Sequence, residues 1–326
     1  MGLLIGIDGG GTNTRGIASD ESGNIMAETT KKSCNLNTLD LGDAAARLKD
    51  VITELVNDIG TKIGTKEIEV EMVVLALAGA ERKEKRKKLL ELVEGEFPVD
   101  PSDTVDIITD SRASLYGSLG GEEGVMVNSG TGAIAMAQDD KGNLARADGW
   151  GYLLGDKGSG YWIGLTAIIK ALEAEDGRGK ETSLESKLMD YYEINRMKKI
   201  IPVIYEKKES SLVESVAGVA PIVFEEASTG DRVASSIISK AGQELGRTAG
   251  AVIKKLDYKG DTVKIVLKGG VFDSTKKEPM MESFEAELSN HVSRWTYAGP
   301  KYSPAEGALI KASELARGQL ISPEWS

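Results

Sequence analysis

The sequence predicts an α/β protein built from two copies of one unit, each a mixed β-sheet flanked by helices. Three observations lead to this prediction. A glycine-rich turn between two apolar, β-rich runs occurs twice, at residues 3–18 and 124–137. Each copy is followed by a short turn that ends in Gly-Asn, at residues 21–24 and 140–143. Segments with strand and helix character then alternate, as in sheets that carry helices on their faces.

The first glycine-rich turn joins two strands with no helix between them. An apolar run over residues 3–7 leads into Asp8 and the triplet Gly9-Gly10-Gly11, and a second β-rich run follows Thr12. Glycine tolerates positive φ angles and lets backbone N–H groups approach a ligand closely. Thr12 adds a side-chain donor, and Asp8 stands at the strand end, where it could orient a metal ion. The stretch therefore indicates a site for a phosphate group and its divalent cation.

The rest of the first half is expected to run strand, helix, strand, helix, strand. β-rich runs and helical spacing of apolar residues alternate in this order over residues 25–29, 41–59, 70–77, 81–93 and 105–109. In open α/β sheets, ligands bind at the carboxyl ends of strands. Asp8, the Ala78-Gly79 turn and Asp110 all follow strands, so we expect them to meet at one edge of the sheet.

The second half repeats the opening pattern. Its turn over residues 129–132 has the sequence Ser-Gly-Thr-Gly and suits a second hairpin that faces a phosphate. A glycine-dense stretch follows over residues 149–164 and contains Trp150 and Asp156. This composition does not suit a regular core element. It predicts a ligand-lining loop that passes into a helix near Tyr161.

The remainder of the second half is expected to be mostly helical. Apolar spacing supports helices over residues 165–256, the last of them a long amphipathic helix from Asp231. A strand over residues 263–267 then enters a third glycine turn, whose glycine pair would let a helix begin close to a flat ligand such as adenine. A final helix is expected from Ser303 to about Leu315.

Composition restricts the classes of function. A chain of 326 residues suggests about two domains, and its net charge of −11 argues against nucleic acid or an anionic membrane as the main partner. No apolar run approaches the ~20 residues of a membrane span, and no secretory signal is evident, so a cytoplasmic protein is expected. The single cysteine, Cys34, excludes an intrachain disulfide. The single histidine, His291, favours a carboxylate for general-base chemistry.

In this order the motifs resemble the N-acetylglucosamine kinase family, a branch of the actin-like sugar kinases that also contains the benzoyl-CoA reductase activators. The resemblance covers nearly the whole chain. Its motifs are residues 8–12, Thr109-Asp110, residues 129–132, Gly149-Trp150-Gly151 with residues 155–159, and Gly269-Gly270-Val271. It implies two actin-like (ribonuclease H-like) lobes with an ATP cleft between them. The lobes would span residues 1–112, completed by a C-terminal helix over about 304–326, and residues 113–303.

The resemblance also implies a role for each motif in phosphoryl transfer from ATP and Mg²⁺ to a sugar. Asp110 matches the catalytic base, and Asp8 would order Mg²⁺ through water. The positions that match nucleotide contacts are Gly9, Gly10, Gly11, Thr12, Gly130, Thr131, Gly132, Ala217, Gly269, Gly270 and Ser274. The positions that match sugar contacts are Asn35, Asp110, Gly149, Trp150, Gly151 and Asp156. Members of the family are often dimers, so a homodimer is expected.

The identity of the sugar stays open at this point. N-acetylglucosamine, or a related hexose or amino sugar, is expected first. However, Cys34-Asn35-Leu36-Asn37 lacks the aromatic residue that animal members carry two places after the asparagine. A sugar acid such as 2-keto-3-deoxygluconate is therefore an alternative acceptor. A redox-activator ATPase is an alternative of another class, although such proteins share a cluster between subunits through more than one cysteine per chain.

Overall fold

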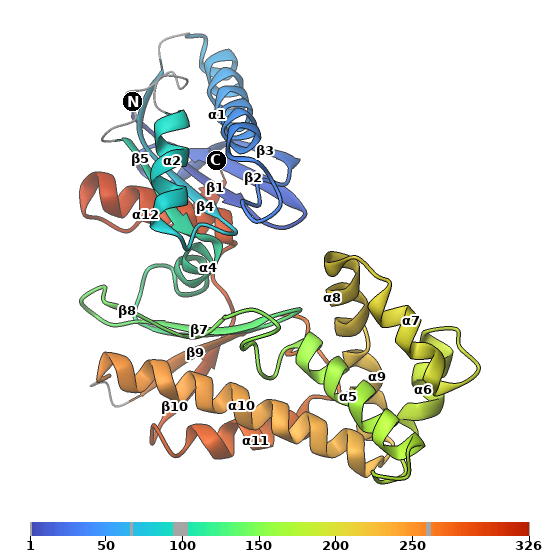
Figure 1. The fold of residues 1–326 in the computed structure, drawn as a ribbon. Helices are drawn as coiled ribbons and strands as arrows, with labels where there is room; N and C mark the ends of the chain where they lie inside the picture. The colour runs from blue at the N-terminus through green and yellow to red at the C-terminus, as the bar shows by residue number, and fades with distance from the viewer. Residues whose placement is uncertain (1, 66–67, 94–103, 259–261, 326) are drawn as a thin grey trace. The chain divides into compact units, whose positions relative to one another are not determined.

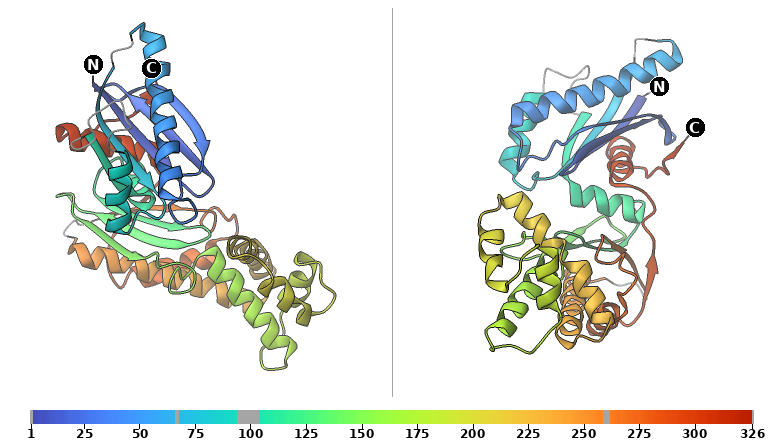
Figure 2. Two further views of the ribbon diagram at one scale, coloured as in Figure 1. Left: turned by 45° about the horizontal axis from the view of Figure 1, so that its top comes forward. Right: turned by 90° about the vertical axis from the view of Figure 1, so that its right-hand side faces the viewer.

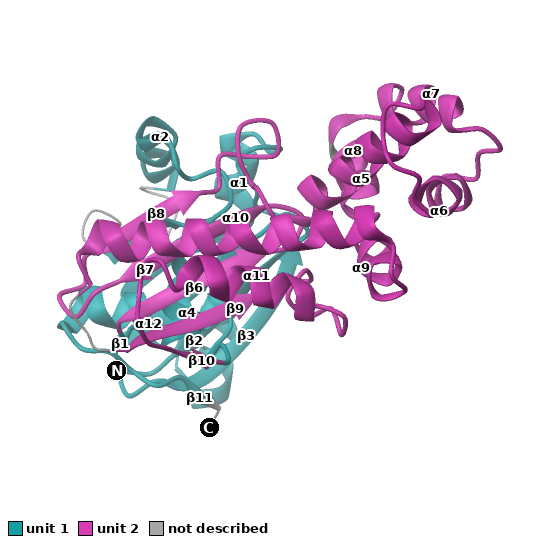
Figure 3. Cartoon of the chain, turned by 90° about the horizontal axis from the view of Figure 1, so that it is seen from below, with its two compact units in different colours: residues 1–122, 299–326 teal, residues 123–298 magenta. Residues whose placement is uncertain are grey.

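The computed structural model describes residues 2–65, 68–93, 104–258 and 262–325. The chain divides into two compact units (Figure 3), unit 1 over residues 1–122 and 299–326 and unit 2 over residues 123–298. The expected division lies ten residues earlier, at 112. The structure places it after helix α4 (Asp110–Leu119) because α4 packs against helix α12 (Pro304–Arg317) within unit 1. Helix α12 ends close to the Leu315 that apolar spacing predicts and short of the 326 that the resemblance implies, since Gly318 adopts a left-handed φ of 66° and ends it.

Unit 1 contains a six-stranded mixed sheet in the order β11-β3-β2-β1-β4-β5. β1 pairs antiparallel with β2 and β2 with β3, whereas β1, β4 and β5 run parallel. The strands are β1 (Gly2–Gly9), β2 (Asn13–Ser19), β3 (Asn24–Lys32), β4 (Glu69–Leu77), β5 (Val105–Thr109) and β11 (Glu324–Trp325). The other helices of this unit are α1 (Leu41–Ile63) and α2 (Lys83–Val93). Except for β11, these elements confirm the predicted order.

Different helices cover the two faces of this sheet (Figure 1), because successive side chains of a strand point to opposite faces. Leu3 and Ile5 of β1 belong to the core that α1 completes, whereas Leu4 belongs to the core that α12 completes. Gly6 faces α12, where a Cβ atom would lie only 2.4 Å from the backbone nitrogen of Leu309. The absent side chain therefore lets α12 approach the sheet closely.

Unit 2 contains a five-stranded sheet in the order β10-β9-β6-β7-β8. Helix α10 packs against the sheet and α11 against α10, while α6, α7 and α8 lie beyond the end of the sheet (Figure 2). The strands are β6 (Gly124–Ser129), β7 (Ala133–Gln138), β8 (Leu144–Asp148), β9 (Val263–Lys268) and β10 (Trp295–Ala298). The helices are α5 (Gly160–Glu175), α6 (Leu184–Tyr191), α7 (Ile200–Tyr205), α8 (Glu209–Ala217), α9 (Ala220–Ser228), α10 (Arg232–Leu256) and α11 (Glu278–Leu288), with a 3₁₀ turn η1 (Met197–Lys199).

The turns after the two hairpins confirm the predicted duplication in detail. Asp20 Oδ1 accepts hydrogen bonds from the backbone N–H groups two and four residues later, at 2.9 and 3.0 Å, and Oδ2 accepts one from Asn24 Nδ2 at 2.8 Å. Asp139 Oδ1 makes the same two bonds at 2.9 and 2.8 Å, and Oδ2 accepts one from Asn143 Nδ2 at 2.8 Å. Both units therefore start with three antiparallel strands, the second and third joined by the same aspartate turn.

Two features of unit 2 differ from the expectations. Strands β8 and β10 carry no clear β pattern in sequence, because each is an edge strand that pairs on one side only and tolerates polar residues. No helix begins at the Gly269-Gly270 pair, since the chain turns there and α11 begins at Glu278.

Among the described residues, no helix is both long and apolar enough to cross a membrane.

Candidate functional site

The carboxyl ends of β1, β4 and β5 lie side by side in unit 1. The strand register pairs Gly9 with Leu77 and Leu77 with Thr109. Asp8 is the last residue but one of β1, and Asp110 follows β5 directly. Both side chains are half-buried. The predicted meeting of the two aspartates at one sheet edge is therefore confirmed.

Asp110 is the first residue of helix α4, and its neighbours hold it there. Thr109 Oγ1 caps the helix by accepting a hydrogen bond from Arg112 N at 3.3 Å. Asp110 Oδ1 accepts one from Ser111 N at 2.8 Å. The positive end of a helix stabilises a carboxylate. Because Thr109 caps the helix, the Asp110 carboxylate is not needed for capping. Its hydrogen bond with Ser111 N fixes its orientation.

The glycine turn of unit 1 contacts the loop that carries Asn35. Ser33 Oγ donates a hydrogen bond to Gly10 O at 2.7 Å, and Asn35 Oδ1 accepts one from Asn37 N at 2.9 Å. Gly79, with a φ of 85°, allows this loop to come close, since a Cβ there would lie 2.8 Å from Asn37 Oδ1. The structure thus joins the predicted phosphate turn to the loop of the predicted sugar position Asn35. The joining residue, Ser33, belongs to no motif that the sequence analysis identifies.

Cys34 lies under this loop and is fully buried. Its Cβ atom is 3.2 Å from the point that a Cβ on Gly9 would occupy. Burial raises the pKa of the Cys34 thiol, so the thiol remains protonated at neutral pH. An enclosed, protonated thiol is a poor ligand for a cluster shared between subunits, which argues against the redox-activator alternative.

Asp8 has a cationic neighbour rather than a cluster of acidic residues. It stands opposite Arg15 in the β1–β2 hairpin. The pKa of Arg15 is raised, chiefly by its hydrogen bond to Glu28 and to a smaller extent by the charge of Asp8. In the described part of the chain, no group of three or more His, Cys, Asp or Glu side chains could hold a metal ion. A cation beside Asp8 would therefore take most of its ligands from water and from a phosphate substrate.

Unit 2 contains a cavity of about 720 Å³ that gathers most of the nucleotide positions predicted in this half. Its volume lies within the range that is typical of small-molecule sites. The predicted positions on its lining are Gly130, Thr131, Ala217, Gly270 and Ser274. They come from the β6–β7 turn, the end of α8 and the segment after β9. Distant parts of the chain therefore converge on one cavity.

The β6–β7 turn is fastened to the start of helix α5. Gly160 N donates a hydrogen bond to Gly130 O at 2.7 Å, and Tyr161 N donates one to Thr131 O at 3.3 Å. Ser159 Oγ accepts one from the N–H three residues later at 3.1 Å. Because these N–H groups are already engaged, α5 positions the turn, and the turn itself faces the cavity.

Two glycines that were expected to contact nucleotide, Gly132 and Gly269, do not line this cavity. A Cβ on Gly269, whose φ is 94°, would lie 2.3 Å from Ser129 O. A Cβ on Gly132 would lie 2.6 Å from Asp156 Oδ2. Gly269 therefore allows close packing of the backbone that carries the lining residues, whereas Gly132 makes room for the carboxylate of Asp156.

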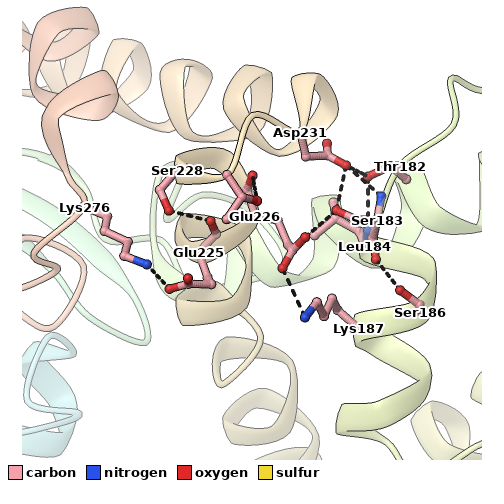
Figure 4. A network of polar contacts seen from close by, with 11 residues as sticks. Thr182, Ser183, Leu184, Ser186, Lys187, Glu225, Glu226, Ser228, Asp231 and Lys276 are labelled. Carbon is pink, nitrogen blue, oxygen red and sulfur yellow. Dashed lines mark hydrogen bonds and ion pairs between the residues drawn. The ribbon is translucent and has the colours of Figure 1, made fainter.

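Helix α9 forms a further wall of the cavity and is anchored on two sides (Figure 4). Glu225 forms an ion pair with Lys276, and both residues line the cavity. The buried Glu226 turns to the other side, where it accepts a hydrogen bond from Ser183 Oγ at 2.5 Å. Ser183 Oγ also lies 2.9 Å from Asp231 Oδ2. These lining residues escape prediction because they resemble the polar surface of any helix.

The loop after β8 carries both an exposed aromatic ring and a buried carboxylate. Trp150 is 68% exposed, and the Arg146 guanidinium lies 5.0 Å from the centre of its ring. Gly149 and Gly151 on either side have φ angles of 72° and 87°. Asp156 is buried, and its Oδ1 accepts a hydrogen bond from Gly151 N at 3.1 Å. The four predicted sugar positions of this loop therefore form one compact group.

Burial sets the electrostatic character of Asp156. Loss of water contact raises the pKa of this carboxyl above its ordinary value, and the charge of Asp148 raises it further. The N–H groups of Gly151 and Ala133 and the charge of Arg146 act in the opposite direction. Asp156 is thus a carboxylate that protonates more readily than one in water.

Comparison with known proteins identifies a family match and similar sugar kinases. The sequence matches the BadF/BadG/BcrA/BcrD ATPase family over residues 5–312. The N-acetylmuramic acid/N-acetylglucosamine kinase of Clostridium acetobutylicum is 28% identical, over 96% of this chain and 98% of that protein. The N-acetyl-D-glucosamine kinase of Dictyostelium discoideum is 33% identical, over 88% of this chain and 93% of that protein.

The fold has a solved counterpart. The structure of a protein assigned as an N-acetylglucosamine kinase from Chromobacterium violaceum superimposes with a TM-score of 0.68 and 23% identity, covering 97% of this chain and 99% of the other. This likeness supports the predicted actin-like α/β fold. Since the family match spans nearly the whole sequence, the chain belongs to the BadF/BadG/BcrA/BcrD ATPase family.

Proposed function

We propose that this protein is an ATP-dependent kinase that transfers the γ-phosphate of ATP to a hydroxyl group of an amino sugar. The observation that carries the proposal is the cavity of unit 2, where nucleotide positions from separate segments meet. Two relatives that cover nearly all of the chain phosphorylate N-acetylglucosamine, and one of them also bears N-acetylmuramic acid in its name. N-acetylglucosamine is therefore the first substrate to test.

In this proposal, unit 2 binds the nucleoside. Ala217, Pro221 and Phe224 supply an apolar wall for the base, and Gly130 and Thr131 face the phosphates. Unit 1 contributes the turn formed by Gly9, Gly10, Gly11 and Thr12. Because Gly10 N already donates a hydrogen bond to Asn13 O at 3.1 Å, the N–H groups later in the turn and the Thr12 hydroxyl are the proposed donors to phosphate oxygens. Gly269 supports the cavity through its close contact with the backbone of Ser129, whereas Gly132 makes room for the Asp156 carboxylate.

Mg²⁺ fits the single carboxylate at the end of β1. Asp8 would hold the ion through water, because among the described residues no group of three or more His, Cys, Asp or Glu side chains could coordinate a metal ion directly. When bound, Mg²⁺ neutralises the phosphate charge.

The sugar would be held by Asn35 in unit 1 and by the loop with Trp150 and Asp156 in unit 2. An exposed indole ring offers a flat apolar surface, and the amide and carboxylate groups offer hydrogen bonds to hydroxyls. Asp110 would accept the proton of the attacking hydroxyl, since its carboxylate is oriented at the sheet edge. Phosphoryl transfer needs this positioning more than covalent chemistry.

The raised pKa of Asp156 leads to a prediction about pH. The ionised carboxylate accepts hydrogen bonds from the sugar, so protonation weakens sugar binding. We expect kcat/KM for the sugar to fall as the pH drops through the raised pKa of Asp156, at a pH above the ordinary aspartate value of about 3.9. In Asp156→Asn, the contribution of Asp156 to this acid limb should disappear, so that only the limb of the general base Asp110 remains, and the sugar KM should be high at every pH. An unchanged acid limb in Asp156→Asn would contradict the assignment.

A coupled assay of ADP release tests the proposed function. The acceptors are N-acetylglucosamine, N-acetylmuramic acid, glucosamine, glucose and 2-keto-3-deoxygluconate, with a reaction that lacks any sugar. We expect ADP release to depend on an amino sugar. ADP release that depends only on 2-keto-3-deoxygluconate would show that the acceptor is a sugar acid and not an amino sugar. Release at the same rate without any sugar would refute the kinase and favour an ATPase of the redox-activator type.

A further inference from the structure

Asp148 is an unexpected residue at the start of the loop that carries Trp150 and Asp156. It ends strand β8 and has a φ of 60°, the left-handed conformation that residues with a Cβ atom rarely adopt. Among the described non-glycine residues, only Asp156, Glu193 and Asp257 share a positive φ. Such a backbone persists where surrounding contacts compensate for its strain.

The compensating contacts of Asp148 are made by its carboxylate. Oδ1 accepts a hydrogen bond from Asp156 N at 2.8 Å, and Oδ2 accepts one from Lys157 N at 3.1 Å. Gly155 makes room for this arrangement, since a Cβ at that position would lie 2.2 Å from Asp148 Oδ1. One carboxylate therefore joins the start of the loop to its end with both oxygen atoms.

The loop has a second bond of the same kind in the opposite direction. Asp156 Oδ1 accepts a hydrogen bond from Gly151 N at 3.1 Å. Arg146 holds the strand side, because its Nε donates to Asp148 O at 3.1 Å while its guanidinium lies over Trp150. The ring of Trp150 and the carboxylate of Asp156 thus take their places from contacts that meet at Asp148.

We infer that Asp148 is a positioning residue that sets the affinity of the site for its sugar by holding Trp150 and Asp156 in their binding geometry. The inference rests on the proposed sugar kinase function. Both carboxylate oxygens of Asp148 accept hydrogen bonds from backbone N–H groups of the loop, so Asp148 acts through the loop. Its effect falls on sugar binding and spares the nucleotide cavity, whose lining does not include any residue of this loop.

Two substitutions separate the carboxylate from the strained backbone. Asp148→Gly accepts the positive φ but removes both hydrogen-bond acceptors, whereas Asp148→Asn tolerates the same φ and keeps one acceptor. Glu193→Gly is the matched control, because Glu193 has a φ of 53° in the turn after α6. This control removes a residue from the same strained conformation without touching the loop.

Steady-state kinetics with varied sugar and varied ATP test the inference. Asp148→Gly should raise the sugar KM by about 10–100-fold, the effect of a misplaced binding group. Asp148→Asn should raise it less, and the ATP KM should stay constant in both variants. Glu193→Gly should change neither constant. An unchanged sugar KM in Asp148→Gly, or an equal rise in both KM values, would overturn the inference.

Limited proteolysis with chymotrypsin gives a second readout that does not depend on activity. The loop exposes Leu153 by 78% and Leu154 by 84%. Cleavage there should be faster in Asp148→Gly than in the wild type or in Glu193→Gly, and equal rates would count against the loop-holding role. If the wild type shows no sugar-dependent turnover, the proposed function fails; a sugar-dependent wild type with an unaffected Asp148→Gly defeats the inference alone.

Discussion

Asp110→Asn is expected to lower kcat by a factor of about 10²–10⁴, the usual contribution of a general base. The amide retains an acceptor for Ser111 N, which now bonds to the carboxylate at 2.8 Å, so the start of α4 should keep its structure. It cannot take the proton of the attacking hydroxyl. Turnover is measured by coupled ADP release and nucleotide affinity by calorimetry with ADP, which should bind as it does to the wild type.

Asp106 provides the matched control for this prediction. It lies within β5, four residues before Asp110, and is likewise half-buried. Asp106→Asn removes the same charge within β5, away from the carboxyl end of the strand that Asp110 follows, so kcat should remain that of the wild type. Near-normal turnover in Asp110→Asn, or an equal loss in Asp106→Asn, would contradict the role given to Asp110.

Gly269→Ala is expected to destabilise the protein by about 2–5 kcal/mol. About 1–2 kcal/mol comes from placing a Cβ at a positive φ, and about 1–3 kcal/mol from overpacking. The overpacking arises because the new Cβ would lie 2.3 Å from Ser129 O, the acceptor of a hydrogen bond from Val271 N. ADP should also bind more weakly, since Gly270 and Ser274 follow the displaced backbone into the cavity.

Gly142→Ala separates the two costs. Gly142 lies in the same unit and has a φ of 78°, but no atom lies within 4 Å of the position of its Cβ. This variant should lose only about 1–2 kcal/mol and should bind ADP normally. The measurement is urea unfolding, in which the midpoint falls at constant slope. Equal midpoints for the two variants would show that the contact with Ser129 carries no weight.

Much of the fold is predictable from sequence because its strongest signals are local. The two hairpins show apolar runs around glycine turns, and Asp20 and Asp139 mark the same turn in both units. Strands β8 and β10 are not predictable in this way, because an edge strand such as Leu144–Asp148 pairs with one neighbour only and needs no alternating apolar pattern.

The site is predictable where its chemistry lies in short motifs. Asp110 and the turn at Gly130 stand next to strand ends and could be found from sequence. Pro221 and Phe224 could not, because tertiary packing alone brings this face of α9 to the cavity. Asp148 could not either, since its partners lie eight and nine residues away across a loop. Gly132 could be recognised as part of a glycine turn, but the contact with Asp156 that requires glycine there depends on the fold.

The central claim is that phosphate passes from ATP to a sugar, and ³¹P NMR of the complete reaction tests it most directly. With ATP, Mg²⁺ and N-acetylglucosamine, we predict a phosphate monoester resonance of the sugar that grows in step with ADP, and none in the reaction without sugar. The appearance of inorganic phosphate alone, at the same rate with and without the sugar, would contradict the account.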